Sequence, residues 1–208
     1  MVAIGILLFI ASALAGIVSP DSVKGALYGY FSERAKEIES AVKGGGLIIL
    51  PLLIFSNNLM VSLIILALFP TIIGPWIFMS FQGFATGAII SYQGVDEGIS
   101  NLTSLIPGCR LSPNELAIAK LSLLIPHGVF EITGIGVFFA SSVRLSIELL
   151  GYIMWKLGKK QEKPNISRAF GSLRIPLLTG VLLLIVAAFV ESFITPIIGF
   201  ISIVFLCR

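Results

Sequence analysis

The chain has 208 residues, of which 56% are hydrophobic and only 12% are charged, and its mean hydropathy is +1.02. A soluble domain carries charge on roughly 25% of its residues, so this chain has too few polar side chains for a water-facing surface. These values indicate an integral membrane protein and exclude a disordered chain, while scattered cations and a net charge of only +3 exclude a nucleic-acid-binding protein.

Five hydrophobic segments are long enough to cross a bilayer, which takes about 20 apolar residues for a core of roughly 30 Å. They span residues 2–18, about 46–69, about 76–92, 113–156 and 175–207. We therefore expect an all-α, polytopic transmembrane helix bundle of about five spans in the cell membrane, forming a single domain over residues 1–208. The first segment resembles a signal peptide, but no basic residue precedes its apolar core, so a retained helix is expected.

Residues 20–43 follow the first segment and are amphipathic. Val23, Leu27 and Tyr30 recur at helical spacing, while charged residues occupy the other face. This pattern predicts a helix that lies at the membrane interface. Acidic and basic residues balance in it, so it lacks the polybasic character that attracts anionic lipids.

The second and third segments are joined by a short connection that contains Pro70 and the turn signal Gly74-Pro75, so we expect a helical hairpin. In the third segment, Gly83 and Gly87 have the four-residue spacing that lets another helix approach closely. We expect this pair to serve internal packing rather than to form a dimer.

The fourth segment has a well-defined start, because Ser112, Pro113 and Glu115 form a capping box with proline at the first helical position. Pro126 and Gly128 lie inside it, and proline removes a backbone donor and clashes with the preceding turn. The sequence therefore predicts a short helix, a break or re-entrant turn, and a long helix from about Gly128 to Lys156.

The connection over residues 156–174 is strongly basic, with four cations between its basic ends and one acidic residue, Glu162. By the positive-inside rule this loop is cytoplasmic. Five spans then place Cys109 and Cys207 on the outer side. A disulfide between them is open, but the spacing indicates no disulfide framework, so unpaired thiols are expected.

The fifth segment is too long for one untilted crossing, and Thr195-Pro196 is expected to interrupt it. Two outcomes stay open. Either a full helix is followed by a terminal half-helix after Pro196, or one tilted helix is kinked there.

Polar side chains inside the apolar segments need partners, because a charge at membrane depth costs at least about 2.5 kcal/mol. The candidates for a buried polar cluster are Asn57, Asn58, Gln82, His127, Glu131 and Glu191. His127 and Glu131 share one helical face. They are either a proton or cation site or a structural clasp, and metal ligation with Glu191 is also open. Arg144 and Glu148 repeat the spacing near an interface, where a structural ion pair is expected.

Several enzyme classes are unsupported. The chain has no His-Glu-x-x-His, no Gly-x-Ser-x-Gly and no P-loop motif, and one histidine falls short of a typical catalytic zinc site. We expect no enzymatic activity and no cofactor.

Three motifs together resemble the stage II sporulation protein M family. They are Pro-His-Gly-Val-Phe-Glu at 126–131, Phe-Ser-Asn-Asn at 55–58 and Ala-Phe-Val-Glu-Ser-Phe-Ile-Thr-Pro at 188–196. The family often has Asn-Gly where this chain has Gln82-Gly83. The resemblance implies a multi-helix membrane scaffold which, in endospore-forming bacteria, helps to assemble a cell-wall-remodelling complex with peptidoglycan hydrolases. Relatives in non-sporulating organisms, archaea included, have no assigned role.

Two hypotheses follow. The first is a non-enzymatic scaffold or assembly factor whose partners are the lipid bilayer and other membrane proteins or a second copy. The alternative is a small transporter or channel that moves a proton, a cation or a small solute through the His127-Glu131-Glu191 cluster, since transporters build such sites from interrupted helices.

Overall fold

The computed structural model describes residues 1–45, 49–92, 99, 103–104, 106, 108–109 and 111–207. The side chains of 34–45 and of Pro113 are not described. No β-strand occurs among the described residues, and nearly all of them are helical. The all-α fold expected from the sequence is therefore confirmed.

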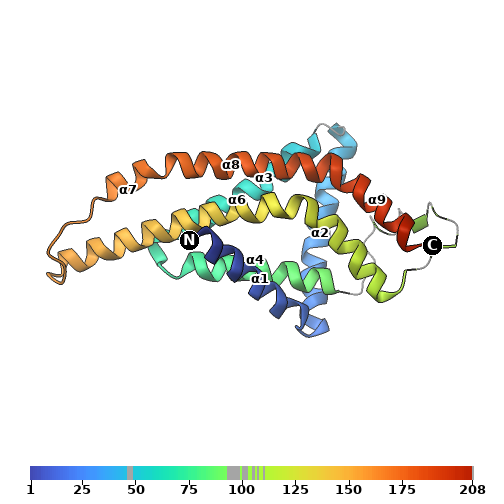
Figure 1. Cartoon of the computed structure of the whole chain (residues 1–208), viewed down its shortest axis with the longest axis horizontal. Helices are drawn as coiled ribbons and strands as arrows, with labels where there is room; N and C mark the ends of the chain where they lie inside the picture. Colours follow the sequence, from blue (N-terminus) through green and yellow to red (C-terminus); the bar gives the residue numbers. More distant parts are fainter. Residues whose placement is uncertain are drawn as a thin grey trace.

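Each of the five hydrophobic segments is helical over most of its described residues. The elements are α1 (Val2–Ile17), α2 (Asp21–Gly45), α3 (Ile49–Ala67), η1 (Phe69–Thr71), α4 (Gly74–Ser91), α6 (Pro113–Lys156), α7 (Ile166–Ser172), α8 (Arg174–Phe189), η2 (Val190–Ile194) and α9 (Thr195–Leu206). Figure 1 shows α1, α3, α4, α6 and α8 running along the long axis of the molecule, while α2 crosses them.

The number of spans is approximate. By length and composition, three described helical segments can cross a membrane: Ile49–Thr71, Asn114–Lys156 and Ile166–Leu206. A fourth is added if α1 and the helix Asp21–Glu33, bent from it by 116°, count as one broken span. The amphipathic segment predicted at 20–43 is helical throughout, and the side chains of its second half lie outside the described set.

Helices α1 and α4 pack along each other with their backbones almost in contact. A Cβ added to Gly87 would collide with the carbonyl of Ala13, and one added to Gly83 would collide with the carbonyl of Phe9. A Cβ added to Gly16 would likewise collide with the carbonyl of Phe84. The prediction that the Gly83 and Gly87 spacing serves internal packing is therefore confirmed.

The main core forms where α1, α3, α4, α6 and α8 meet. Phe138 and Phe139 of α6 and Leu184 of α8 are fully buried there. Two serines of α6 join it to α3 and η1: Ser142 Oγ donates to the Ile65 carbonyl at 2.7 Å, and Ser146 Oγ donates to the Phe69 carbonyl at 2.7 Å. Such bonds stabilise helix pairs in lipid, where the hydrophobic effect supplies no association energy.

The predicted break at Pro126 and Gly128 is wrong, because α6 continues through both residues. The helix bends in this region instead (Figure 1). Proline removes only one backbone donor, and membrane helices tolerate this loss when neighbouring groups satisfy the freed carbonyl. The capping box at the start of α6 is confirmed, since Ser112 N donates to Glu115 Oε2 at 2.7 Å.

The interruption predicted at Thr195-Pro196 takes the form of a π-helical turn. The five residues of η2 join α8 to α9, and Pro196 stands in the first turn of α9. Of the two outcomes left open, the structure has the kinked helix (Figure 1). A π turn is one of the recognised causes of a helix kink, and it often marks a functional site.

The expectation of unpaired thiols is wrong. Cys109 and Cys207 form a disulfide, with their Cα atoms 5.0 Å apart. The bond joins the segment before α6 to the end of α9, across 98 residues of sequence. Spacing alone could not predict it, because the fold brings the two residues together.

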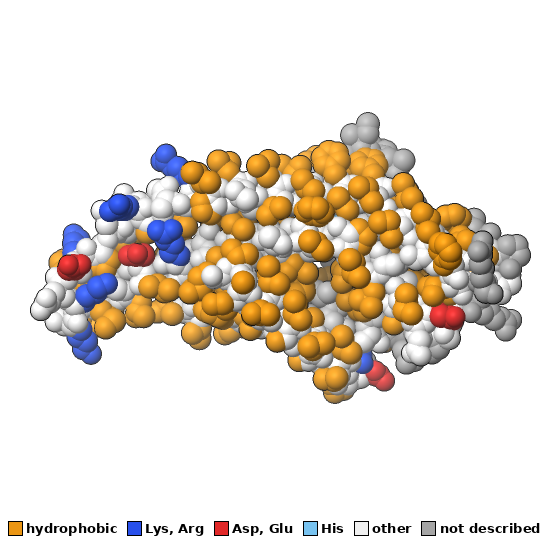
Figure 2. Space-filling view, viewed as in Figure 1, with side chains coloured by type: hydrophobic (Ala, Val, Ile, Leu, Met, Phe, Trp, Pro, Cys, Tyr) orange, Lys and Arg blue, Asp and Glu red, His pale blue; other side chains and the backbone are white. Residues whose placement is uncertain are grey.

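The basic connection after α6 forms one end of the molecule. Part of it is helical, because Asn165 caps α7 by accepting a hydrogen bond from the Arg168 backbone N–H at 2.9 Å. Figure 2 shows most of the lysine and arginine side chains of the visible face at this end and a largely hydrophobic surface over the middle. The amino terminus lies on the half of the molecule nearer this end, and the carboxyl terminus lies at the opposite end (Figure 1).

Candidate functional site

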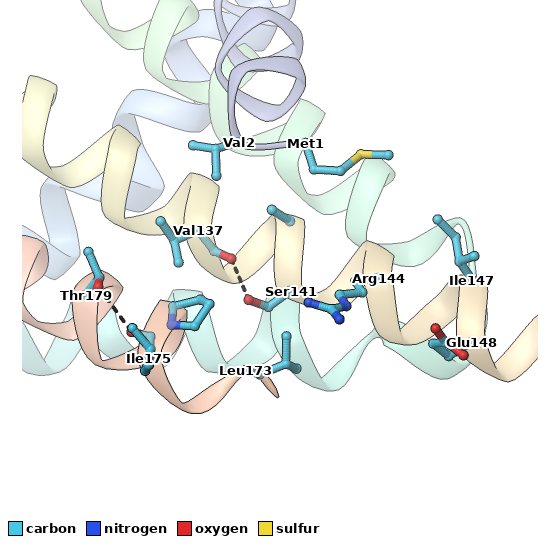
Figure 3. A pocket seen from close by; sticks show the side chains of 12 residues that line it. Met1, Val2, Val137, Ser141, Arg144, Ile147, Glu148, Leu173, Ile175 and Thr179 are labelled. Carbon is cyan, nitrogen blue, oxygen red and sulfur yellow. Dashed lines mark hydrogen bonds between the residues drawn. The ribbon is translucent and has the colours of Figure 1, made fainter. Parts of the chain in front are cut away.

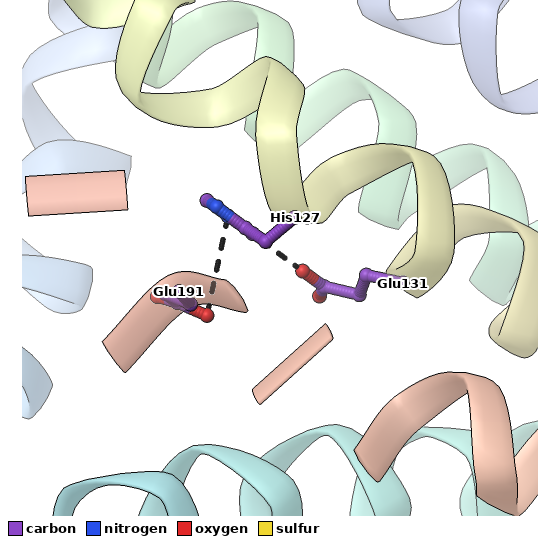
Figure 4. Close-up of side chains that lie close together, drawn as sticks. All are labelled: His127, Glu131 and Glu191. Atoms are coloured by element: carbon purple, nitrogen blue, oxygen red, sulfur yellow. Dashed lines mark ion pairs between the residues drawn. The ribbon is translucent and has the colours of Figure 1, made fainter. Parts of the chain in front are cut away.

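Two of the site residues lie one turn apart on α6. The i, i+4 spacing of His127 and Glu131 puts them on one helix face, with Nε2 of His127 4.0 Å from Oε2 of Glu131. The third residue, Glu191, comes from η2. Its Oε2 also lies 4.0 Å from His127 Nε2, so the imidazole stands between two carboxylates (Figure 4).

The histidine is fixed from its other side. His127 Nδ1 is 3.2 Å from Oγ1 of Thr195, and both residues are buried, with 8% and 6% of their surface exposed. This hydrogen bond leaves Nε2 directed at the carboxylates. The sequence predicts Thr195 only as part of a helix interruption and not as a partner of His127. The sequence feature that could have indicated this role is the position of Thr195, four residues after Glu191, which places both side chains on one helical face.

The basic group beside the two carboxylates is the imidazole of His127. Among the described residues, no lysine or arginine lies within 4.0 Å of Glu131 or Glu191. Their side chains are 25% and 35% exposed, respectively. Carboxylate charge in an apolar protein interior must be compensated, and the proton or cation site expected from the sequence stays a prediction for these residues.

Among the described residues, the other three candidates make no hydrogen bond or ion pair with this group. Asn57 Nδ2 donates to Asn58 Oδ1 at 3.3 Å within α3. Gln82 lies half-buried on α4. No hydrogen bond or ion pair in the described part of the chain links these three to His127, Glu131 or Glu191, so the convergence of all six stays a prediction.

A separate groove of about 520 Å³ lies between α1, α6 and α8. Apolar side chains line most of it, including Val137, Ile147 and Ile175, and Arg144 and Glu148 lie at one end (Figure 3). The predicted Arg144–Glu148 ion pair is wrong, since no ion pair within 4.0 Å joins these two described residues. The Arg144 side chain is exposed and the Glu148 side chain is half-buried, so each charged group can reach the surface without pairing with the other.

Buried Lys120 was not predicted to have a role. Its Nζ donates to the Tyr92 carbonyl at 2.6 Å, and Tyr92 is the C-cap of α4. A cation at a helix C-terminus satisfies a terminal carbonyl and stabilises the helix dipole. Lys120 therefore fixes α6 against the end of α4.

Comparison with known proteins gives two matches. The family described as Stage II sporulation protein M matches residues 5–196. An uncharacterised protein of Methanocaldococcus jannaschii is 29% identical over 144 residues, which cover 69% of this chain and 69% of that protein. No solved structure matches this chain.

Proposed function

The chain belongs to the stage II sporulation protein M family, and on this basis we propose that it is a non-enzymatic scaffold for other membrane proteins. It resides in the cell membrane as a multi-pass protein. It binds a helix of a partner within the bilayer and holds that partner in an assembly.

The two ends of the molecule differ in chemistry, and this difference supports one orientation of the protein in the membrane. The basic end after α6 belongs on the cytoplasmic side by the positive-inside rule. The disulfide between Cys109 and Cys207 lies at the opposite end and requires an oxidising compartment. Both features favour the same orientation, with the disulfide end outside.

The observation that carries the proposal is the separation of the groove from the polar site. On α6 the groove is lined by residues 137–148, whereas the polar site uses His127 and Glu131. An open, apolar groove facing the bilayer suits a helix better than a solute. Arg144 is exposed at its end and forms no ion pair with any described residue, so the matching helix carries an acidic residue near the cytoplasmic interface.

A crosslinking experiment tests this proposal. A photoreactive amino acid at Ile147, in the groove, is expected to form a discrete adduct with a membrane protein in native membranes. The same probe at Ile64 of α3, which is exposed and does not line the groove, is the control. We expect the adduct to weaken at least about tenfold in an Arg144→Gln variant.

Four outcomes count against the scaffold. Adducts with lipid alone from Ile147, or equal protein adducts from Ile64, would remove the support for a helix-binding groove. An adduct with a second copy of the chain would replace the partner by self-association. In proteoliposomes, flux of protons or metal cations that disappears in Glu131→Gln would favour the transport alternative.

A further inference from the structure

We propose that His127, Glu131 and Glu191 bind one divalent transition-metal ion, such as Zn²⁺, that joins α6 to the π turn η2. This site is distinct from the helix-binding groove. The inference does not depend on the scaffold role, because a metal ion would hold these helices together whatever the protein assembles.

The positions of the ligand atoms fit one ion. One donor atom from each residue can be chosen so that all three lie within 4.8 Å of one another. In a tetrahedral site with metal–ligand distances of about 2.0–2.2 Å, donor atoms are roughly 3.3 Å apart. The ligand atoms must therefore move closer together by up to about 1.5 Å, which rotations of the glutamate side chains allow.

The histidine is already oriented for coordination. Ligating histidines usually form a hydrogen bond through the other ring nitrogen, which fixes the ring. Here Nδ1 of His127 bonds Thr195 Oγ1, and Nε2 points between the carboxylates, 4.0 Å from each. Thr195 and Glu191 both come from the segment at the η2–α9 junction. The π turn therefore positions both the proposed ligand Glu191 and the hydroxyl group that orients His127.

Charge and donor type select the class of ion. Two carboxylates with no lysine or arginine partner among the described residues are neutralised by a divalent cation. One imidazole nitrogen with two carboxylate oxygens suits Zn²⁺, Mn²⁺ or Fe²⁺ better than Mg²⁺ or Ca²⁺, which prefer oxygen alone. The two cysteines are paired with each other and offer no thiolate.

Metal analysis of the full chain in detergent tests the site. The protein is purified with a histidine-free tag, stripped with chelator, loaded with Zn²⁺ or Co²⁺ and dialysed. We expect about one ion per chain. Zn²⁺ at about 100 times its Kd should raise Tm by about 5–10 °C. His127→Ala, Glu131→Gln and Glu191→Gln should each weaken binding at least about tenfold, whereas the matched control Glu148→Gln should bind normally.

A second measurement uses the unmodified chain, in case the variants fold poorly. His127 is the one histidine in the sequence, so ¹⁵N-histidine labelling gives a single imidazole spin system. Zn²⁺ is expected to shift the Nε2 signal strongly. Loss of the ion on dialysis, or an Nε2 signal that does not respond to Zn²⁺ or Co²⁺, would overturn the proposal. Binding that is equal in all variants would overturn it as well.

Discussion

Gly87→Leu is expected to destabilise the protein by about 3–5 kcal/mol, because the added side chain meets backbone rather than a movable side chain. The Ala13 carbonyl occupies the position that the new Cβ would take. To make room, α1 must move away from α4 along its length, which also separates Gly83 from Phe9. The measurement is thermal unfolding in detergent, where a fall in Tm of about 6–20 °C is expected.

A matched glycine substitution controls for helix propensity. Gly29 of α2 is helical, and a Cβ added there has nothing within 4 Å. Gly29→Ala should leave Tm unchanged or raise it slightly, since alanine favours a helix by up to about 1 kcal/mol over glycine. If Gly87→Leu matched wild type in Tm and yield, the close α1–α4 contact would be wrong.

Local sequence patterns predicted much of this fold because they depend on short-range physics. Apolar runs located each hydrophobic helix, and the capping box located the start of α6 at Pro113. The Gly83 and Gly87 spacing predicted close packing correctly, since a four-residue period puts both on one face. It did not identify α1 as the partner, which depends on the tertiary fold.

The sequence rules failed where tertiary contacts decide the local conformation. Pro126 bends α6 without ending it, because a helix packed among others can lose one backbone hydrogen bond. Near Pro196 the chain forms a π turn rather than a clean break. The proline rules indicate a disturbance at each site and cannot choose its form.

The candidate site was predicted in part. The spacing of His127 and Glu131 placed them on one face, and Glu191 joins them from 60 residues further along the sequence. That long-range contact was predicted only from the rule that polar side chains inside apolar segments need partners. The supporting hydrogen bond between Thr195 and His127 was not predicted, because hydroxyl groups in membrane helices commonly bond their own backbone.

Removing the disulfide is the other change expected to have a large effect. Cys109→Ser with Cys207→Ser is expected to lower the free energy of unfolding by about 2–4 kcal/mol and Tm by roughly 4–16 °C. The bond closes 98 residues of sequence, so reducing it frees a long loop in the unfolded chain. Reductant should lower the Tm of the wild-type protein similarly and leave the double variant unchanged.

The same bond tests the orientation of the protein. In intact cells, a membrane-impermeant reductant followed by an impermeant maleimide should label Cys109 and Cys207, because the proposed orientation puts the basic end on the cytoplasmic side and the disulfide outside. The double serine variant gives the background. Labelling only after the membrane is permeabilised would invert the topology. It would also put the two cysteines in the reducing cytosol, where disulfides rarely persist. If they were then labelled without added reductant, they would be free thiols, and the Cys109–Cys207 pairing would be wrong.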